Sequence, residues 1–166
     1  MTYKVRVDRI AQDISDEVKD AILEFLPSYD FPYSTSVENK AALKQVFIEH
    51  FQKRHSLDWL KEQILRLSYS RMGYAAVALC ETNRLHTKGL GTVLLAQGQT
   101  KCSTVHTYGY TTPMSPECRE NLEGKTLDIR DVITNSFPKT IDDLNRKDIP
   151  MIPQHFNCRH VMAPLE

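Results

Sequence analysis

The sequence predicts an α+β protein with a helical N-terminal half, then one long helix and a small β-containing module that cysteine and histidine residues close. Two observations predict this order. Apolar residues recur at helical spacing in the first half, and the period changes to two at Lys101. A chain of 166 residues, 41% of them hydrophobic, fits one domain or one domain plus a helical arm. We expect a helical arm or docking region at 1–72 and a second domain at 73–166.

Three helices are predicted in the first half. The first begins behind Ser15 and ends at Pro27, the second follows a capping-box signature at Thr35 and runs to about Arg54, and the third begins behind Ser56. Apolar stripes mark the first and third helices: Ile14, Val18 and Ile22, and Leu57, Leu60, Ile64 and Leu67. We expect these stripes to form the core or to dock on a partner helix.

The segment 74–97 predicts a fourth, long helix because it is rich in Ala, Val and Leu. Gly89 and Gly91 each cost about 1 kcal/mol relative to Ala within a helix, so we expect a bend or break there. Glu81 and Arg84 have the i, i+3 spacing of side chains that pair along a helix. We interpret them as an ion pair on the helix surface.

From Lys101 onward the alternation predicts a strand. One face would carry Ser103, Val105 and Thr107, with Cys102, His106, Tyr108 and Tyr110 between them. The two prolines of 111–117 predict a loop, and 126–133 is typical of a second strand or a short mixed segment. We expect the polar stretch 136–153 to be an ordered excursion that returns the chain to its last motif.

Composition excludes several classes of function. The 21 basic and 21 acidic side chains cancel, so no uniform field would hold the chain on nucleic acid or on an anionic membrane. No apolar run approaches the roughly 20 residues of a membrane helix. The segment from Met1 to Ala11 is charged where a signal peptide would be apolar. We therefore expect neither a polybasic binder nor a secreted protein, and no membrane partner.

The neutral total hides two oppositely charged stretches. Residues 1–30 hold four basic and seven acidic side chains, whereas residues 40–72 hold seven basic and three acidic ones. Two solvated helix faces explain this division, because salt confines each field to about 10 Å. An acidic partner would instead be met by the basic side chains of the second stretch: Lys44, Lys53, Arg54, Lys61, Arg66 and Arg71.

Cysteine and histidine gather in the last third of the chain. Structural zinc is usually held by four Cys or His ligands that come from two short clusters. Cys118 would supply the first cluster, and His155, Cys158 and His160 the second; Ser115 stands where a Cys-x-x-Cys partner would be. Two alternatives stay open: inert buried thiols beside satisfied histidines, and a Cys118–Cys158 disulfide, which a reducing compartment disfavours.

Catalytic interpretations have less support. Cys80, Glu81, His86 and His106 include a nucleophile and acid–base groups, but nothing in their spacing brings them together. We therefore expect a protein that is not an enzyme, with a hydrolase or nuclease that uses His86, His106 or Glu81 as the alternative.

Three segments carry a further signal. They are Leu79–Arg84, Ser115–Lys125, and Pro153–His160 followed by Pro164. In this order they resemble the head-morphogenesis, or minor head protein, family of tailed phages (the Mu-F-like domain), with its Arg-Thr-Glu helix, its Cys-Pro-x-Cys-x-x-Leu-x-Gly-Lys segment and its closing Pro-x-His-Pro-x-Cys-Arg-Cys. Ser115 replaces the first cysteine of that pattern, whereas His160 replaces the last and keeps a zinc ligand. The resemblance covers 74–166.

The resemblance implies a structural protein of the phage head, present in the host cytoplasm during assembly. It implies a portal or major capsid protein as partner, with an interface on the stripe of Leu57 or of Ile14. It also implies a role in head assembly and in the delivery of packaged DNA, which the basic side chains of 40–72 would face. Two other classes stay open: a metal-dependent nuclease or hydrolase-type toxin domain, because related domains also occur attached to toxins, and a metal-stabilised protein-binding module.

Overall fold

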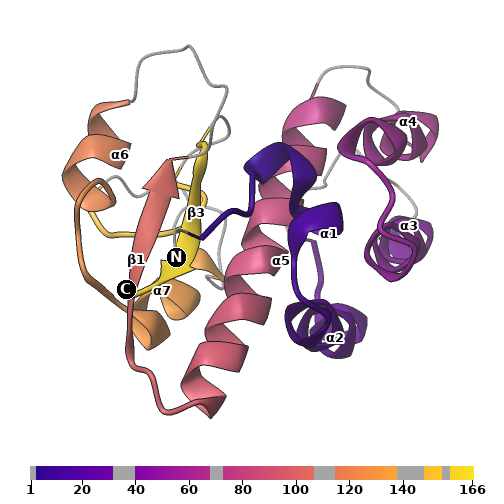
Figure 1. The fold of residues 1–166 in the computed structure, drawn as a ribbon. Coiled ribbons are helices and arrows are strands. Elements are labelled where there is room, and N and C mark those ends of the chain that lie inside the picture. The colour runs from indigo at the N-terminus through magenta and orange to yellow at the C-terminus, as the bar shows by residue number, and fades with distance from the viewer. Residues whose placement is uncertain (1–2, 32–39, 68–72, 107–114, 138–147, 155–157) are drawn as a thin grey trace.

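The computed structural model describes residues 3–31, 40–67, 73–106, 115–137, 148–154 and 158–166. Helices from the first half lie on one side of a long helix, α5, and a small antiparallel sheet with two short helices lies on the other (Figure 1). The predicted α+β class is therefore confirmed. None of the described helices is long and apolar enough to span a bilayer.

The N-terminal half is helical, as predicted. Its elements are η1 (Val7–Arg9), α1 (Ile10–Asp13), α2 (Asp16–Phe25), η2 (Leu26–Ser28), α3 (Lys40–Gln52) and α4 (Leu57–Leu67). Ser15 begins α2, because its side chain accepts a hydrogen bond from the Val18 amide at 3.3 Å. The predicted capping box at Thr35 lies outside the described residues.

The apolar stripes of these helices are buried inside this chain. Ile14, Val18 and Ile22 belong to the hydrophobic core, and so do Leu57, Leu60 and Ile64. The expectation that one of these stripes forms an interface with a partner is therefore wrong: the stripes have already packed against the neighbouring helices.

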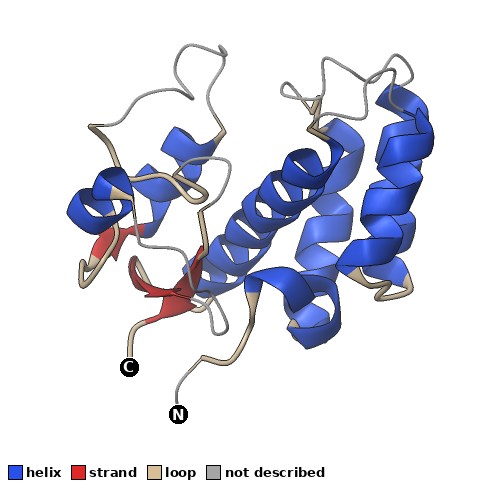
Figure 2. Ribbon diagram, turned by 90° about the horizontal axis from the view of Figure 1, so that it is seen from above, coloured by secondary structure: helices blue, strands red, loops and turns tan. Residues whose placement is uncertain are grey.

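The long helix α5 (Tyr74–Ala96) packs against elements of both halves, namely α2, α4, α7 and β3. Figure 2 shows it crossing the molecule between the two groups. It runs without interruption through Gly89 and Gly91, so the predicted bend or break is wrong. A Cβ at Gly89 would lie 2.5 Å from Ile22 Cγ1, and one at Gly91 would lie 2.5 Å from Ile133 Cδ1. The glycines let neighbouring helices approach closely, and this packing outweighs their low helix propensity.

Three strands form one antiparallel sheet of order β2-β1-β3. They are β1 (Lys101–His106), β2 (Leu127–Asp128) and β3 (His160–Pro164). The first was predicted, although its expected continuation through Thr107, Tyr108 and Tyr110 lies outside the described residues. The third was missed, because four consecutive buried residues replace the alternation that marks a half-exposed strand.

Two short helices complete the module. The predicted loop at 111–117 is wrong at its end, because Ser115 caps α6 (Pro116–Asn121) and Pro116 occupies its first turn. The predicted mixed segment at 126–133 is confirmed, since β2 leads directly into α7 (Ile129–Ser136). The buried side chains of both halves join in one continuous core.

Candidate metal centre

Three buried ligand groups meet where α6 faces the start of β3. The sulfur atoms of Cys118 and Cys158 lie 3.6 Å apart, and Nδ1 of His160 lies 3.9 Å from the Cys158 sulfur. All three ligand atoms lie within 4.8 Å of one another. Both cysteines are thiols, so the alternative disulfide is not formed. A thiolate–imidazole group of this geometry can hold a metal ion.

Local sequence signals place Cys118 in this group. The Ser115 hydroxyl accepts a hydrogen bond from the Cys118 amide at 3.2 Å, and the Cys118 carbonyl accepts one from the Leu122 amide at 2.9 Å. Ser115, which stands where the head-morphogenesis pattern has a cysteine, therefore caps α6. It starts the helical turn that carries Cys118.

Tertiary contacts place His160. It pairs in register with His106 of β1, and its carbonyl accepts a hydrogen bond from the Asn83 side chain of α5 at 2.8 Å. The hydroxyl of Thr87, one turn further along α5, lies 3.1 Å from the Ile152 carbonyl. The long helix therefore fixes both the strand that carries the histidine and the chain that leads into it.

Protons compete with a metal ion for this group. A hydrogen bond with Cys118 and burial raise the pKa of the Cys158 thiol well above its ordinary value. Burial disfavours protonation of His160, but hydrogen bonds with Cys118 and Glu123 outweigh it, and the pKa of His160 is raised. In the absence of metal the Cys158 thiol therefore keeps its proton, and a bound cation would displace it.

Two further histidines concern this site. His155, the fourth predicted ligand, lies outside the described residues. His106 is beside the group, with its ring centroid 5.0 Å from that of His160. Burial and the neighbouring His160 lower the pKa of His106. The sequence suggested His106 only as a catalytic group, because strand register, and not spacing in the chain, brings it here.

Glu81 and Arg84 form an ion pair in the interior, so the predicted surface pair is wrong. Their exposed fractions are 0% and 5%, and the Arg84 guanidinium donates to Glu81 Oε1 at 2.9 Å. The Tyr29 hydroxyl donates to the other carboxylate oxygen, and burial together with the Glu81 charge raises the Tyr29 pKa. Polar residues on one face of a helix predict that this face is exposed to solvent. Here Tyr29 of the N-terminal half covers them.

The other groups considered for catalysis are also in the interior. His86 Nε2 forms a hydrogen bond with the Tyr3 hydroxyl at 2.8 Å, and burial lowers the His86 pKa to about 3. Burial raises the pKa of the Cys80 thiol to about 12, which leaves it a poor nucleophile. Cys80, Glu81 and His86 are therefore all buried in the interior.

The basic side chains of 40–67 mostly contact this chain itself. Arg54 donates to the Ala11 and Ile14 carbonyls at 3.1 and 2.8 Å and pairs with Asp16 at 2.7 Å. The other described contacts are Lys44 with the Pro27 carbonyl, Lys53 with Glu49, Lys61 with Asp58, and Arg66 with Glu62. Arg71 lies outside the described residues. Arg54 thus fastens α3 to the N-terminal segment.

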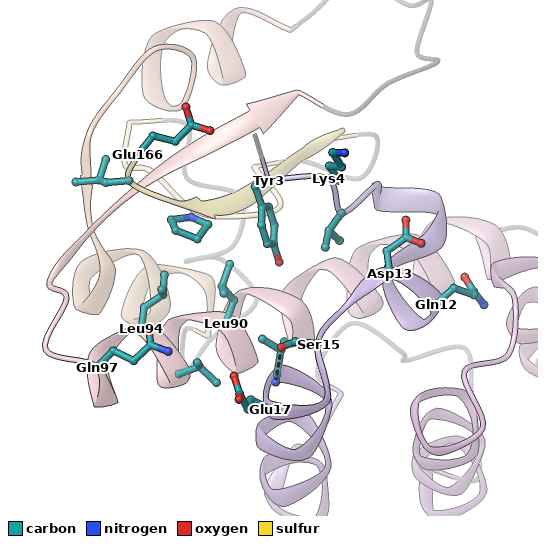
Figure 3. Close-up of a pocket in the computed structure, with 15 residues that line it drawn as sticks. Tyr3, Lys4, Gln12, Asp13, Ser15, Glu17, Leu90, Leu94, Gln97 and Glu166 are labelled. Carbon is teal, nitrogen blue, oxygen red and sulfur yellow. Dashed lines mark hydrogen bonds between the residues drawn. The ribbon is translucent and has the colours of Figure 1, made fainter. Parts of the chain in front are cut away.

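An open groove of about 1110 Å³ lies away from the metal centre, between the N-terminal segment, the C-terminal part of α5 and the end of β3. Figure 3 shows Tyr3 reaching toward α5, with Leu90 and Leu94 turned toward it. Charged side chains border the groove: Lys4, Asp13, Glu17 and Glu166. Figure 3 shows these side chains at different places around the groove.

No family model, no curated protein and no solved structure matches this chain.

Proposed function

We propose that this chain is a structural minor head protein of a tailed phage, in which residues 73–166 form a rigid module closed by zinc. The observation that carries the proposal is the meeting of the three segments that resemble the head-morphogenesis family. Asn83 of the first donates to His160 of the third at 2.8 Å, and Cys118 of the second lies 3.6 Å from Cys158 of the third. Segments that share one packed unit support a common origin better than three separate motifs would.

Sulfur and nitrogen distances support zinc as the metal. Bonds of about 2.3 Å to sulfur and 2.0–2.1 Å to nitrogen in a tetrahedron put two sulfurs about 3.8 Å apart and a sulfur and nitrogen about 3.6 Å apart. The observed separations are 3.6 Å between the sulfurs and 3.9 Å from sulfur to nitrogen. Cys118, Cys158 and His160 would supply three ligands, and His155 is the proposed fourth. The closed shell of a structural zinc site suits a module without catalysis.

The surfaces left open by the fold suggest where a portal or capsid protein would bind. Because the apolar stripes of the helices are buried, the groove between Tyr3 and Leu90 is the better candidate. Leu165 lies at this groove with 43% of its surface exposed, and it is the one large hydrophobic side chain that the described residues leave exposed. Packaged DNA is a second proposed partner, through the basic side chains of 40–72.

The head proposal is tested on particles. We expect the chain to sediment with purified heads or procapsids of the phage that encodes it, at a copy number far below that of the major capsid protein, as measured by quantitative mass spectrometry. Its absence from heads, procapsids and virions alike would remove the proposal.

Elemental analysis tests the metal. We expect one zinc ion per chain in protein purified without chelators, and its loss in Cys118→Ser and Cys158→Ser. Cys102→Ser is the matched control, because Cys102 is an equally buried thiol on β1 outside the ligand group. A protein free of zinc under these conditions would contradict the zinc part of the proposal and leave the head assay to decide the rest.

A further inference from the structure

A carboxylate lies against the ring of His160 on the side away from the two thiols. Oε2 of Glu123 is 2.7 Å from Nε2 of His160, while Nδ1 of the same ring faces the Cys158 sulfur at 3.9 Å. His160 is 1% exposed, whereas Glu123 keeps 47% of its side chain in solvent. The imidazole therefore bridges a carboxylate at the surface and the buried sulfur pair.

The fold holds Glu123 in this position. The amides of Leu122 and Glu123 both donate to the Cys118 carbonyl, at 2.9 and 3.0 Å. The Leu122 carbonyl in turn accepts a hydrogen bond from the Thr104 side chain of β1 at 2.9 Å. One turn of chain thus carries both the Cys118 thiol of the ligand group and the carboxylate that faces Nε2 of His160.

This arrangement selects a tautomer. A carboxylate is an acceptor, so the ring nitrogen beside it carries the proton, and the other nitrogen presents its lone pair. Histidines that bind metals commonly donate their second N–H to a carboxylate, which fixes the ring and makes the ligand nitrogen more basic. Glu123 meets both requirements without taking a ligand position itself.

We propose that Glu123 is the positioning residue of the metal centre: it holds His160 as an Nδ1 ligand and thereby strengthens zinc binding. The inference rests on the proposed zinc site and adds a residue outside its ligand set. No pattern in the sequence singles out Glu123, because it is one of several acidic residues in a charged segment and only the return of β3 brings a histidine to it.

Zinc affinity tests the assignment. We would titrate full-length wild-type protein, Glu123→Gln and Glu123→Ala with Zn²⁺ against a chromophoric chelator. Both variants should bind zinc about 10–100-fold more weakly. The matched control is Glu120→Gln, which removes an exposed carboxylate from α6, three residues before Glu123, and should leave the affinity at the wild-type value. Circular dichroism of each variant checks the fold, which a half-exposed side chain should not endanger.

A spectroscopic readout separates positioning from a general effect on stability. Long-range ¹H–¹⁵N spectra of zinc-loaded wild type should show His160 bound through Nδ1 with a proton on Nε2. Glu123→Ala should weaken or broaden that Nε2 proton signal. Unchanged affinity in both Glu123 variants, or binding through Nε2, would overturn the inference. Failure of the wild type to bind zinc would instead overturn the zinc site on which it rests.

Discussion

The two sides of α5 are held together by different means. On one side, α2, α3 and α4 bury apolar stripes and an aromatic cluster, in which the rings of Phe31 and Phe47 lie 4.8 Å apart. On the other, strands of six, two and five residues surround a buried group of two thiols and an imidazole. Burying polar groups costs free energy unless they are hydrogen-bonded or bind a cation.

The difference indicates where a metal ion would contribute to the fold. The helical side has a ready driving force in its apolar surface. The sheet side has short strands and a polar centre, so a metal ion would supply cross-links that its small core lacks. Four predictions examine this contrast, from the largest expected effect to the smallest.

Loss of one thiol ligand should have the largest effect. In zinc-loaded protein, Cys158→Ser should lower the free energy of unfolding by several kcal/mol, because zinc binding is coupled to folding. Cys102→Ser should cost only about 1–3 kcal/mol, through packing and a buried hydroxyl. Urea unfolding measures both values. Hydrogen exchange should locate the loss of protection in α6, β1 and β3; equal loss in α3 and α4 would contradict the contrast.

Breaking the buried ion pair should affect α5 and the helical side that covers it. Arg84→Met leaves the Glu81 carboxylate without its charge partner, and uncompensated buried charges of this kind cost about 3–5 kcal/mol. Because Tyr29 also binds Glu81, exchange protection should fall in the N-terminal half as well as in α5. As a control, Arg66→Ala removes a surface pair with Glu62 and should cost under about 1 kcal/mol. A similar cost for both variants would show that burial does not matter here.

Acid should destabilise the fold through its buried histidines. The pKa values of His50 and His86 fall from 6.5 to about 3, because burial opposes their charged form. Between these values the unfolded chain binds more protons, so stability should rise with pH through this window and fall as pH drops below 6.5. At pH 5 each histidine should cost roughly 2 kcal/mol.

Variants assign this loss to α5 and to α3. His86→Gln keeps a hydrogen-bonding group for Tyr3, and His50→Phe fills a site among aromatic rings of α3 and α4. Each should make the stability between pH 7 and pH 5 less dependent on pH, as measured by urea unfolding. A wild-type slope in both variants would mean that other groups carry the acid sensitivity.

The two glycines of α5 should give the smallest and most local effects. Gly89→Ala drives a methyl against Ile22 and the Val18 carbonyl of α2, whereas Gly91→Ala meets the flexible Ile133 side chain of α7. Overpacking costs about 1–3 kcal/mol, and the helix recovers about 1 kcal/mol from alanine. The first variant should therefore be the more destabilised one in calorimetry.

Hydrogen exchange distinguishes the two glycine variants. Gly89→Ala should loosen α2, and Gly91→Ala should loosen α7. Thr92→Ala, at an exposed position of the same helix, is the control and should change neither. Loosening of the same element by both variants would show that α5 does not separate two packing environments.

Local signals made most helices predictable. Ser15 and Pro27 flank a segment whose apolar residues recur with the helical period of 3.6. They predicted the bounds of α2 closely, because capping and side-chain spacing act within one turn. The burial of Glu81 could not be read from the same kind of signal, since its polar face meets Tyr29, 52 residues away. The strand β3 escaped notice because it is covered on both faces and shows no alternation.

In the candidate site, too, some residues could be predicted from the sequence and others could not. Residue type and spacing singled out Cys118, Cys158 and His160, because few side chains bind soft cations and these are rare in the chain. Glu123 and His106 were not assigned to the site, since each reaches His160 only through the pairing of β1 with β3 and the docking of α6.

What the amino-acid order alone determined is the helical character of the first half of the chain and the chemical identity of the candidate metal ligands. Both depend on interactions that reach only a few residues along the chain, or on the side chain itself. Tertiary structure decided which polar residues are buried, which glycines lie against a neighbouring helix, and which ring nitrogen of His160 faces the thiols. Those outcomes depend on groups 37 to 83 positions apart, whose meeting is fixed only when the whole core packs.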